Sequence, residues 1–69
     1  MNPTGPVLLV TSTAAIEHHD AAPQAQRHAH RWLRRSAAQL GEWVTILDVA
    51  SGATVKRYVM RNGRVERAQ

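Results

Sequence analysis

The chain has 69 residues, a formal net charge of +4 and no cysteine. A chain of this length supports one domain with a thin core, and the lack of cysteine excludes both disulfides and thiolate metal sites. With 43% hydrophobic and 20% charged residues, the chain is too apolar to be disordered by composition.

No apolar stretch approaches the roughly 18 residues that a membrane-spanning helix needs. The apolar run at residues 7–10 is also too short for a secretory signal and has no basic flank. We therefore expect a cytoplasmic protein without a membrane partner.

The N-terminal segment of the chain is rich in proline and glycine. Residues 1–6 contain Pro3, Gly5 and Pro6 and predict a flexible lead-in, which leaves residues 7–69 as the single domain. Val7–Thr11 is a short continuous apolar run, typical of a strand that is covered on both faces. Residues 12–20 fit either a continuation of that strand or a loop.

Residues 21–40 predict an amphipathic helix. Asp20 is a favourable N-cap, Pro23 falls in the first turn, and Gly41 stands where a left-handed residue often ends a helix. At about 100° per residue, one face is apolar and the opposite face is basic. The apolar face holds Ala22, Ala25, Ala29, Trp32, Leu33, Ser36 and Leu40, and the basic face holds Arg27, Arg31, Arg34 and Arg35.

The rest of the chain has strand and turn chemistry. Residues 42–49 and Thr54–Arg61 are rich in β-branched and aromatic side chains, with a turn at residues 50–53 between them. Asn62-Gly63 is a strong hairpin signal, and residues 64–67 follow it as a short strand. The order β-α-β-β-β predicts an α+β fold in which one helix packs on a mainly antiparallel sheet.

The strands carry apolar side chains on both faces, whereas the predicted helix covers one face. An uncovered apolar face rimmed by charge is typical of an interface, and a homodimer is its simplest form. In the alternative hairpin register, Val55 and Val59 take the places of Tyr58 and Met60 on this face. The predicted oligomer or partner interface comprises Trp43, Leu47, Tyr58 and Met60.

The arginines are the main functional signal, because like charges at helical spacing destabilise a helix unless they meet an acidic partner. The alternative interpretation is a solvated face that keeps the protein soluble. An acidic protein, a nucleoprotein complex or nucleic acid would each suit these side chains. The predicted partner-binding residues are Arg27, Arg31, Arg34, Arg35, Arg57, Arg61 and Arg64.

The four histidines do not predict a metal site. His28 and His30 lie on opposite sides of the helix, and His18 and His19 point apart in either regular structure. A site could still form if residues 12–20 folded back onto His28. No catalytic triad, nucleophile elbow or glycine-rich phosphate loop is recognisable, so we expect neither a cofactor nor an enzyme.

Residues 41–48 (GEWVTILD), Ser51-Gly52 and residues 61–65 (RNGRV) follow a helix rich in alanine and arginine. In this layout, over residues 20–67, the chain resembles small phage and mobile-element proteins such as some anti-CRISPR inhibitors of type I surveillance complexes. The resemblance implies a protein that docks on a host complex and blocks it without chemistry. It assigns no binding residue.

Three hypotheses follow. The first is a non-enzymatic protein, encoded by a phage or mobile element, that docks on a host protein or nucleoprotein complex and inhibits or modulates it. The second is a dimeric nucleic-acid-binding protein that uses the helix arginines. The third is a small metal-binding regulator that uses the histidines.

Overall fold

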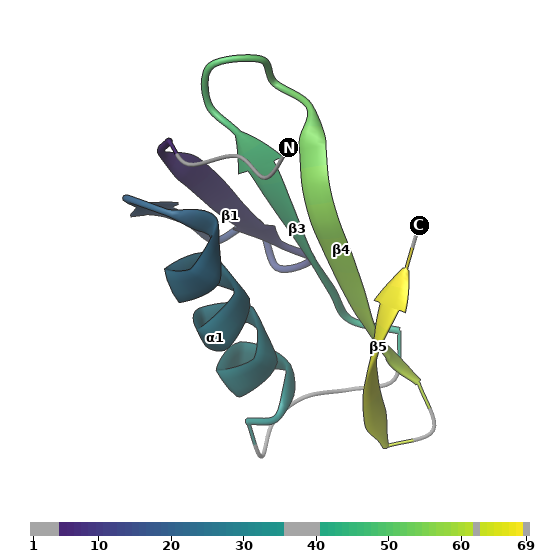
Figure 1. Ribbon diagram of the computed structural model, residues 1–69. Coiled ribbons are helices and arrows are strands. Elements are labelled where there is room, and N and C mark those ends of the chain that lie inside the picture. The colour runs from purple at the N-terminus through teal and green to yellow at the C-terminus, as the bar shows by residue number, and fades with distance from the viewer. Residues whose placement is uncertain (1–4, 36–40, 62, 69) are drawn as a thin grey trace.

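The computed structural model describes residues 5–35, 41–61 and 63–68, which form one helix and one sheet (Figure 1). The five strands lie in the spatial order β2-β1-β3-β4-β5, and every neighbouring pair is antiparallel. Helix α1 packs on one face of the sheet, against β1, β3 and β4. The elements are β1 (Val7–Thr11), β2 (Ile16–His19), α1 (Ala22–Leu33), β3 (Trp43–Asp48), β4 (Thr54–Arg61) and β5 (Arg64–Ala68).

The predicted α+β class and the order β-α-β-β-β are confirmed. Strands β1 and β4 have the predicted bounds, and the other two predicted strands differ by a residue at their ends. Residues 1–4 of the predicted lead-in lie outside the described residues. In the described part of the chain, no helix is long and apolar enough to cross a bilayer.

Residues 12–20, which the sequence predicted to be either a continued strand or a loop, contain an additional strand, β2. This strand pairs with β1 as a hairpin. Thr11, 2% exposed, closes the turn between them. Its backbone N–H donates to the carbonyl of Ala15 at 2.9 Å, and its side-chain oxygen accepts from the backbone N–H of Ala15 at 3.1 Å. These bonds return the chain along β1 and so place β2 at the edge of the sheet.

Ala14 in this turn has a φ of 68°, in the left-handed region that disfavours side chains with a Cβ. Replacing Ala14 by Gly should therefore raise the free energy of unfolding by up to about 1 kcal/mol. The relief of strain, about 1–2 kcal/mol, exceeds the added entropy of the unfolded chain, about 0.4–1 kcal/mol. Urea unfolding measures the change. Ala15→Gly should lower stability, and a lower urea midpoint for Ala14→Gly would contradict the argument.

The core lies between α1 and the sheet. Along α1 the fully covered positions recur every three or four residues, as expected for one face of a helix. Three of these four positions are alanine, which lets the helix backbone approach the strands closely. The buried apolar residues are Val7, Leu9, Ala22, Ala25, Ala29, Leu33, Val44, Ile46, Tyr58 and Met60.

The predicted helix ends are wrong in part. The helix begins at Ala22 after Ala21, which makes no side-chain capping hydrogen bond, so Asp20 is not the N-cap. Strand β2 runs to His19, and this fixes where the helix can begin. Pro23 lies in the first turn as predicted.

At its other end, α1 stops at Leu33 rather than at residue 40. The backbone N–H of Arg35 donates to the carbonyl of Trp32 at 3.3 Å, and the Arg35 guanidinium donates to the same carbonyl at 2.7 Å. In a continuing helix, the carbonyl of Trp32 would accept a hydrogen bond from the backbone N–H four residues further on. In this tightened turn, Arg35 is the donor instead. Residues 36–40, including Ser36 and Leu40 of the predicted apolar face, lie outside the described residues.

Both predicted turns between β3, β4 and β5 are present. In the first, the carboxylate of Asp48 accepts from the backbone N–H of Ser51 at 3.1 Å and from its hydroxyl at 2.7 Å. Gly63 in the second turn has a φ of 74°, which suits glycine. Its neighbour Asn62 lies outside the described residues.

Burial raises the pKa of Tyr58 above its usual value of 10.0, and the nearby charge of Arg67 opposes part of this rise. Because the folded pKa exceeds the unfolded one, stability should be lost as the pH rises above 10.0 through the folded pKa. Tyr58 is the chain's single tyrosine, so ultraviolet absorbance reports its ionisation directly. We expect a midpoint above 10.0 in the folded chain, which urea should lower. Tyr58→Phe should reduce the alkaline loss of stability, and a folded midpoint below 10.0 would contradict the assignment.

Candidate functional site

The face of the sheet opposite α1, which we call the open face, carries apolar side chains from four strands. Strand β1 alternates between fully buried residues toward α1 and half-buried residues on the other side. The sequence predicted that β1 would be covered on both faces, whereas α1 covers one face of this strand. The apolar residues of the open face are Leu8, Val10, Ile16, Trp43, Leu47 and Val59.

The strand register brings these residues side by side. Leu8 lies opposite Leu47, Val10 lies opposite Ile16, and Trp43 lies opposite Val59. Ile16 is 60% exposed at the β2 edge, and the others are half-buried because they shield one another. The open face therefore gathers apolar residues of β2, β1, β3 and β4, with Thr45 among them opposite Val10.

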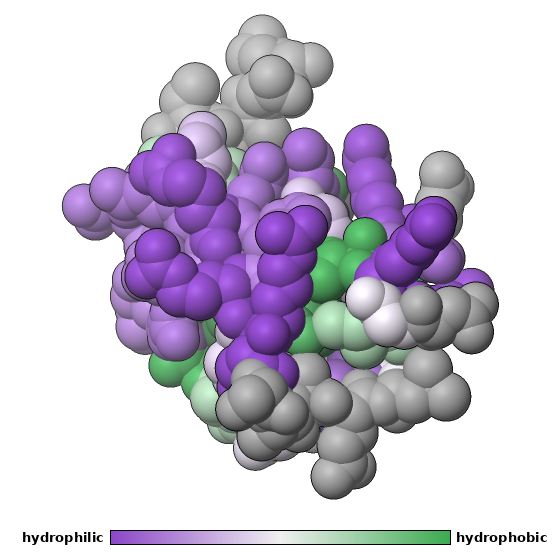
Figure 2. Space-filling view, turned by 90° about the horizontal axis from the view of Figure 1, so that it is seen from below, coloured by the Kyte–Doolittle hydropathy of each residue, from purple (hydrophilic) through white to green (hydrophobic). Residues whose placement is uncertain are grey.

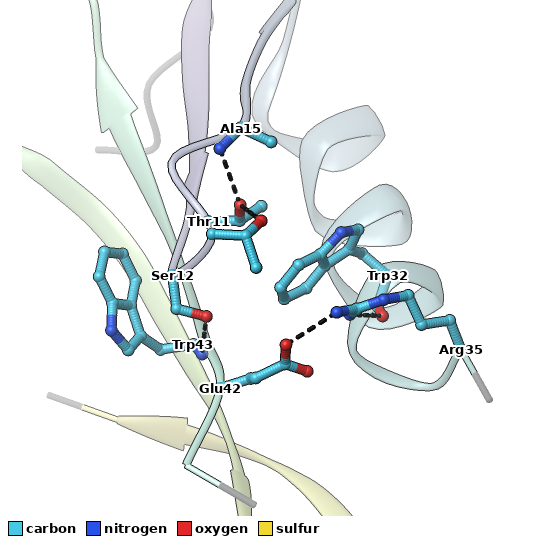
Figure 3. A network of polar contacts seen from close by, with 8 residues as sticks. Thr11, Ser12, Ala15, Trp32, Arg35, Glu42 and Trp43 are labelled. Carbon is cyan, nitrogen blue, oxygen red and sulfur yellow. Dashed lines mark hydrogen bonds and ion pairs between the residues drawn. The ribbon is translucent and has the colours of Figure 1, made fainter. Parts of the chain in front are cut away.

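Trp43 has a defined position on this face. Its backbone N–H donates to the Ser12 hydroxyl at 3.2 Å. Figure 3 shows its ring on the opposite side of the strands from Trp32 and α1. The Arg57 guanidinium lies 4.9 Å from the centre of the Trp43 ring. This contact joins the apolar part of the open face to a basic part.

Two predicted interface residues, Tyr58 and Met60, lie elsewhere. They are 7% and 9% exposed and belong to the core under α1. Tyr58 pairs with Val44, whose side chain is buried toward the helix, so Val59 takes the open side next to Trp43. The alternative hairpin register is therefore the one that forms, except that Val55 packs against the core.

The basic part of the open face comes from β4 and β5. Arg57 lies opposite Thr45, and Arg61 lies opposite Arg64 across the hairpin. Like charges directly opposite each other destabilise a strand pair. Within the part of the chain that the structure describes, no carboxylate forms an ion pair with these three arginines. Glu66 lies opposite Val59 on the same ladder, two residues from Arg64.

The helix arginines form a separate basic surface. Arg27 and Arg31 on α1, and Arg34 directly after its end, are exposed on the other side of the sheet from the hairpin arginines. Figure 2 views the molecule from below and shows hydrophilic side chains on both sides of a strip of hydrophobic surface. The predicted arginine set is thus split into two surfaces. A shallow groove along α1 is lined by Pro23, Gln26, Arg27, His30, Arg31, Arg34 and Arg35.

Arg35 has an internal role that the sequence did not predict. Its guanidinium stacks 3.6 Å from the centre of the Trp32 ring and pairs with the Glu42 carboxylate at 2.8 Å (Figure 3). With its bond to the Trp32 carbonyl, this geometry links the end of α1 to the start of β3. Arg35 therefore differs from the three exposed arginines of the helix.

A histidine and glutamate cluster lies between β2 and α1. His19 Nε2 is 3.0 Å from Glu17 Oε1, and His28 Nδ1 is 3.5 Å from the same oxygen. The two imidazole rings meet edge to face, with their centres 4.6 Å apart. The spacing along the helix and along the strand did not predict this cluster, because β2 supplies two members and α1 the third. His30 instead stacks edge to face on Tyr58.

Comparison with known proteins adds no relative. The chain matches no protein-family model, no curated protein and no solved structure.

Proposed function

We propose that the chain is a non-enzymatic binding protein that docks through the open face onto a partner protein whose apolar surface is rimmed by acidic groups. The single observation behind this proposal is the junction of apolar and basic side chains at Trp43 and Arg57. An apolar patch of this kind on a small chain favours association. The docking and inhibitory role implied by the resemblance to anti-CRISPR proteins remains part of this proposal.

The side chains of the open face favour a protein over nucleic acid. Leu8, Val10 and Leu47 are aliphatic and offer bases neither an aromatic ring nor a hydrogen bond. Single-stranded nucleic acid is usually bound on several aromatic rings, whereas the described open face offers Trp43, whose ring Arg57 already contacts. Aliphatic surface is better matched by apolar side chains of a protein partner.

Charge favours a different protein over a second copy. The chain carries a net charge of +4, and the open face brings Arg57, Arg61 and Arg64 together with the carboxylate of Glu66. A second copy would add the same excess of positive charge. An acidic partner would place carboxylates against these arginines, which speeds association and fixes orientation.

The test compares affinity capture from a cell extract by the wild-type chain and by Ile16→Glu and Leu47→Glu variants. Each variant should retain about tenfold less of the captured partner, because an unpaired carboxylate buried in an apolar interface costs more than about 1.4 kcal/mol. Gln24→Glu makes the same charge change on the exposed side of α1 and should leave capture unchanged. Circular dichroism checks that all variants are folded.

Three results would contradict the proposal. Capture that nuclease abolishes would indicate nucleic acid. Light scattering that shows a dimer, dissociated by Leu47→Glu, would indicate that a second copy covers the open face. Capture lost in an Arg27→Ala, Arg31→Ala, Arg34→Ala variant but retained in Leu47→Glu would move the binding surface to the groove along α1.

The second candidate function is nucleic-acid binding by the groove along α1, and it would account for capture that depends on the helix arginines. The exposed arginines of α1 favour it, because within the described residues Arg27, Arg31 and Arg34 have no carboxylate partner. Phosphate contacts by these side chains would weaken steeply with added salt. Binding of a labelled oligonucleotide at several salt concentrations distinguishes this function from protein docking.

A further inference from the structure

The cluster of Glu17, His19 and His28 has the composition and geometry of a metal site. Glu17 and His19 are two residues apart on β2, so their side chains project to the same side of the strand. That side faces α1, whose contacts with β2 include the edge-to-face pair of His19 and His28. The hairpin and the helix thus bring three ligand residues together from two elements.

The distances suit a tetrahedral ion. Ligand atoms bound at about 2.0–2.1 Å to a tetrahedral metal lie roughly 3.3 Å from one another. The Glu17 oxygen lies 3.0 Å from the His19 nitrogen and 3.5 Å from the His28 nitrogen, on either side of that separation. All three ligand atoms lie within 4.8 Å of one another. Small side-chain rotations would bring them around one ion.

The chemistry of the three groups selects the ion. Two imidazoles and one carboxylate suit Zn²⁺ and neighbouring divalent transition metals, whereas Mg²⁺ and Ca²⁺ require more oxygen ligands. The Glu17 and His28 side chains are 46% and 49% exposed, so an ion can enter from solvent, and His19 is 10% exposed and forms the inner wall. A water molecule would occupy the fourth position.

We propose that Glu17, His19 and His28 bind one divalent transition-metal ion, with Zn²⁺ as the preferred ion. The ion ties the edge strand β2 to α1. Small chains that lack disulfides often gain stability from a metal, and this chain has no cysteine. The proposal does not depend on the proposed docking function, although β2 also carries Ile16 of the open face.

The experiment uses the full-length chain stripped of metal by a chelator. Isothermal titration with zinc chloride should give one ion per chain. Zinc at about a hundred times its dissociation constant should raise the melting temperature by roughly 10 °C or more, since an ion that binds the folded chain alone stabilises it. EDTA should reverse the shift, and cobalt should give the absorption spectrum of a tetrahedral site.

Two variants test the ligands. His28→Ala and Glu17→Gln should each weaken zinc binding at least about tenfold while remaining folded, because both side chains are half exposed. His18→Ala is the matched control, since His18 neighbours His19 on β2 but projects to the open face opposite Leu8. Its zinc affinity should equal that of the wild type.

Four results would overturn the proposal. The first is a melting temperature indifferent to both zinc and EDTA. The second is equal loss of affinity in His18→Ala and His28→Ala, which would indicate non-specific binding to surface histidines. The third is one ion per two chains, and the fourth is retention of zinc affinity in both ligand variants.

Discussion

Replacing Leu33 by Ala should lower the free energy of unfolding by about 3 kcal/mol. Leu33 is fully buried, and it is the largest of the four buried side chains of α1, whose other members are Ala22, Ala25 and Ala29. Its removal takes away a fully buried apolar contact between the end of the helix and the sheet. A chain of this size has roughly 3–10 kcal/mol of stability in total, so the variant should lose a large part of it.

Urea and thermal unfolding measure this loss, with a fall in melting temperature of more than about 10 °C expected. Leu8→Ala is the matched control, because it makes the same change at a half-buried position on the open face. It should cost about 1 kcal/mol, since the lost side chain is shielded on one side alone. Equal losses in the two variants would contradict the assignment of the core to the α1 side of the sheet.

The sequence predicted those elements whose evidence is local. The β-branched and apolar runs of β1 and β4 marked both strands with their observed bounds, and Gly63 marked the second hairpin. Strand β2 was left open because its sequence, Ile-Glu-His-His, has no strand signal of its own. What makes it a strand is the ladder with β1 and the bonds of Thr11 with Ala15, neither of which a local pattern reveals.

The end of α1 shows a second limit of local patterns. The apolar spacing continues past Leu33, and Gly41 was interpreted as the residue after the helix. Gly41 does have a positive φ, 88°, but its backbone N–H donates to the carbonyl of Met60 in β4. The helix ends earlier because Arg35 engages Trp32 and Glu42, a contact between residues seven apart that spacing rules do not include.

Which residues form the candidate surfaces depends on the register in which the strands pair. The sequence showed that one sheet face would lack a helix, and Trp43 and Leu47 lie on that face. It did not decide whether Tyr58 or Val59 would join them, because a shift of one residue exchanges the two faces of a strand. The ladder also has an irregularity between Ile46 and Leu47, where side chains on β4 change their alternation.

The histidine cluster depended on the same kind of information. Its members come from an edge strand that the sequence did not identify and from the middle of a helix that it did. Spacing argued against a site on the helix alone or on the strand alone, and left open a site formed by residues 12–20 folding back onto His28. The site requires the pairing of β2 with β1, which carries His19 toward His28.

Replacing Ala29 by Leu should lower the free energy of unfolding by about 1–3 kcal/mol, although leucine and alanine both favour helices. Ala29 is fully buried in the middle of α1, where its small side chain sets the approach of the helix to the sheet. A larger side chain would lift α1 and separate His28 from Glu17, so zinc affinity should fall together with stability. Gln24→Leu adds leucine at an exposed position of the same helix and should change neither. If Ala29→Leu were as stable as the wild type, space would have to exist under α1, and close alanine packing could not be what holds His28 beside β2.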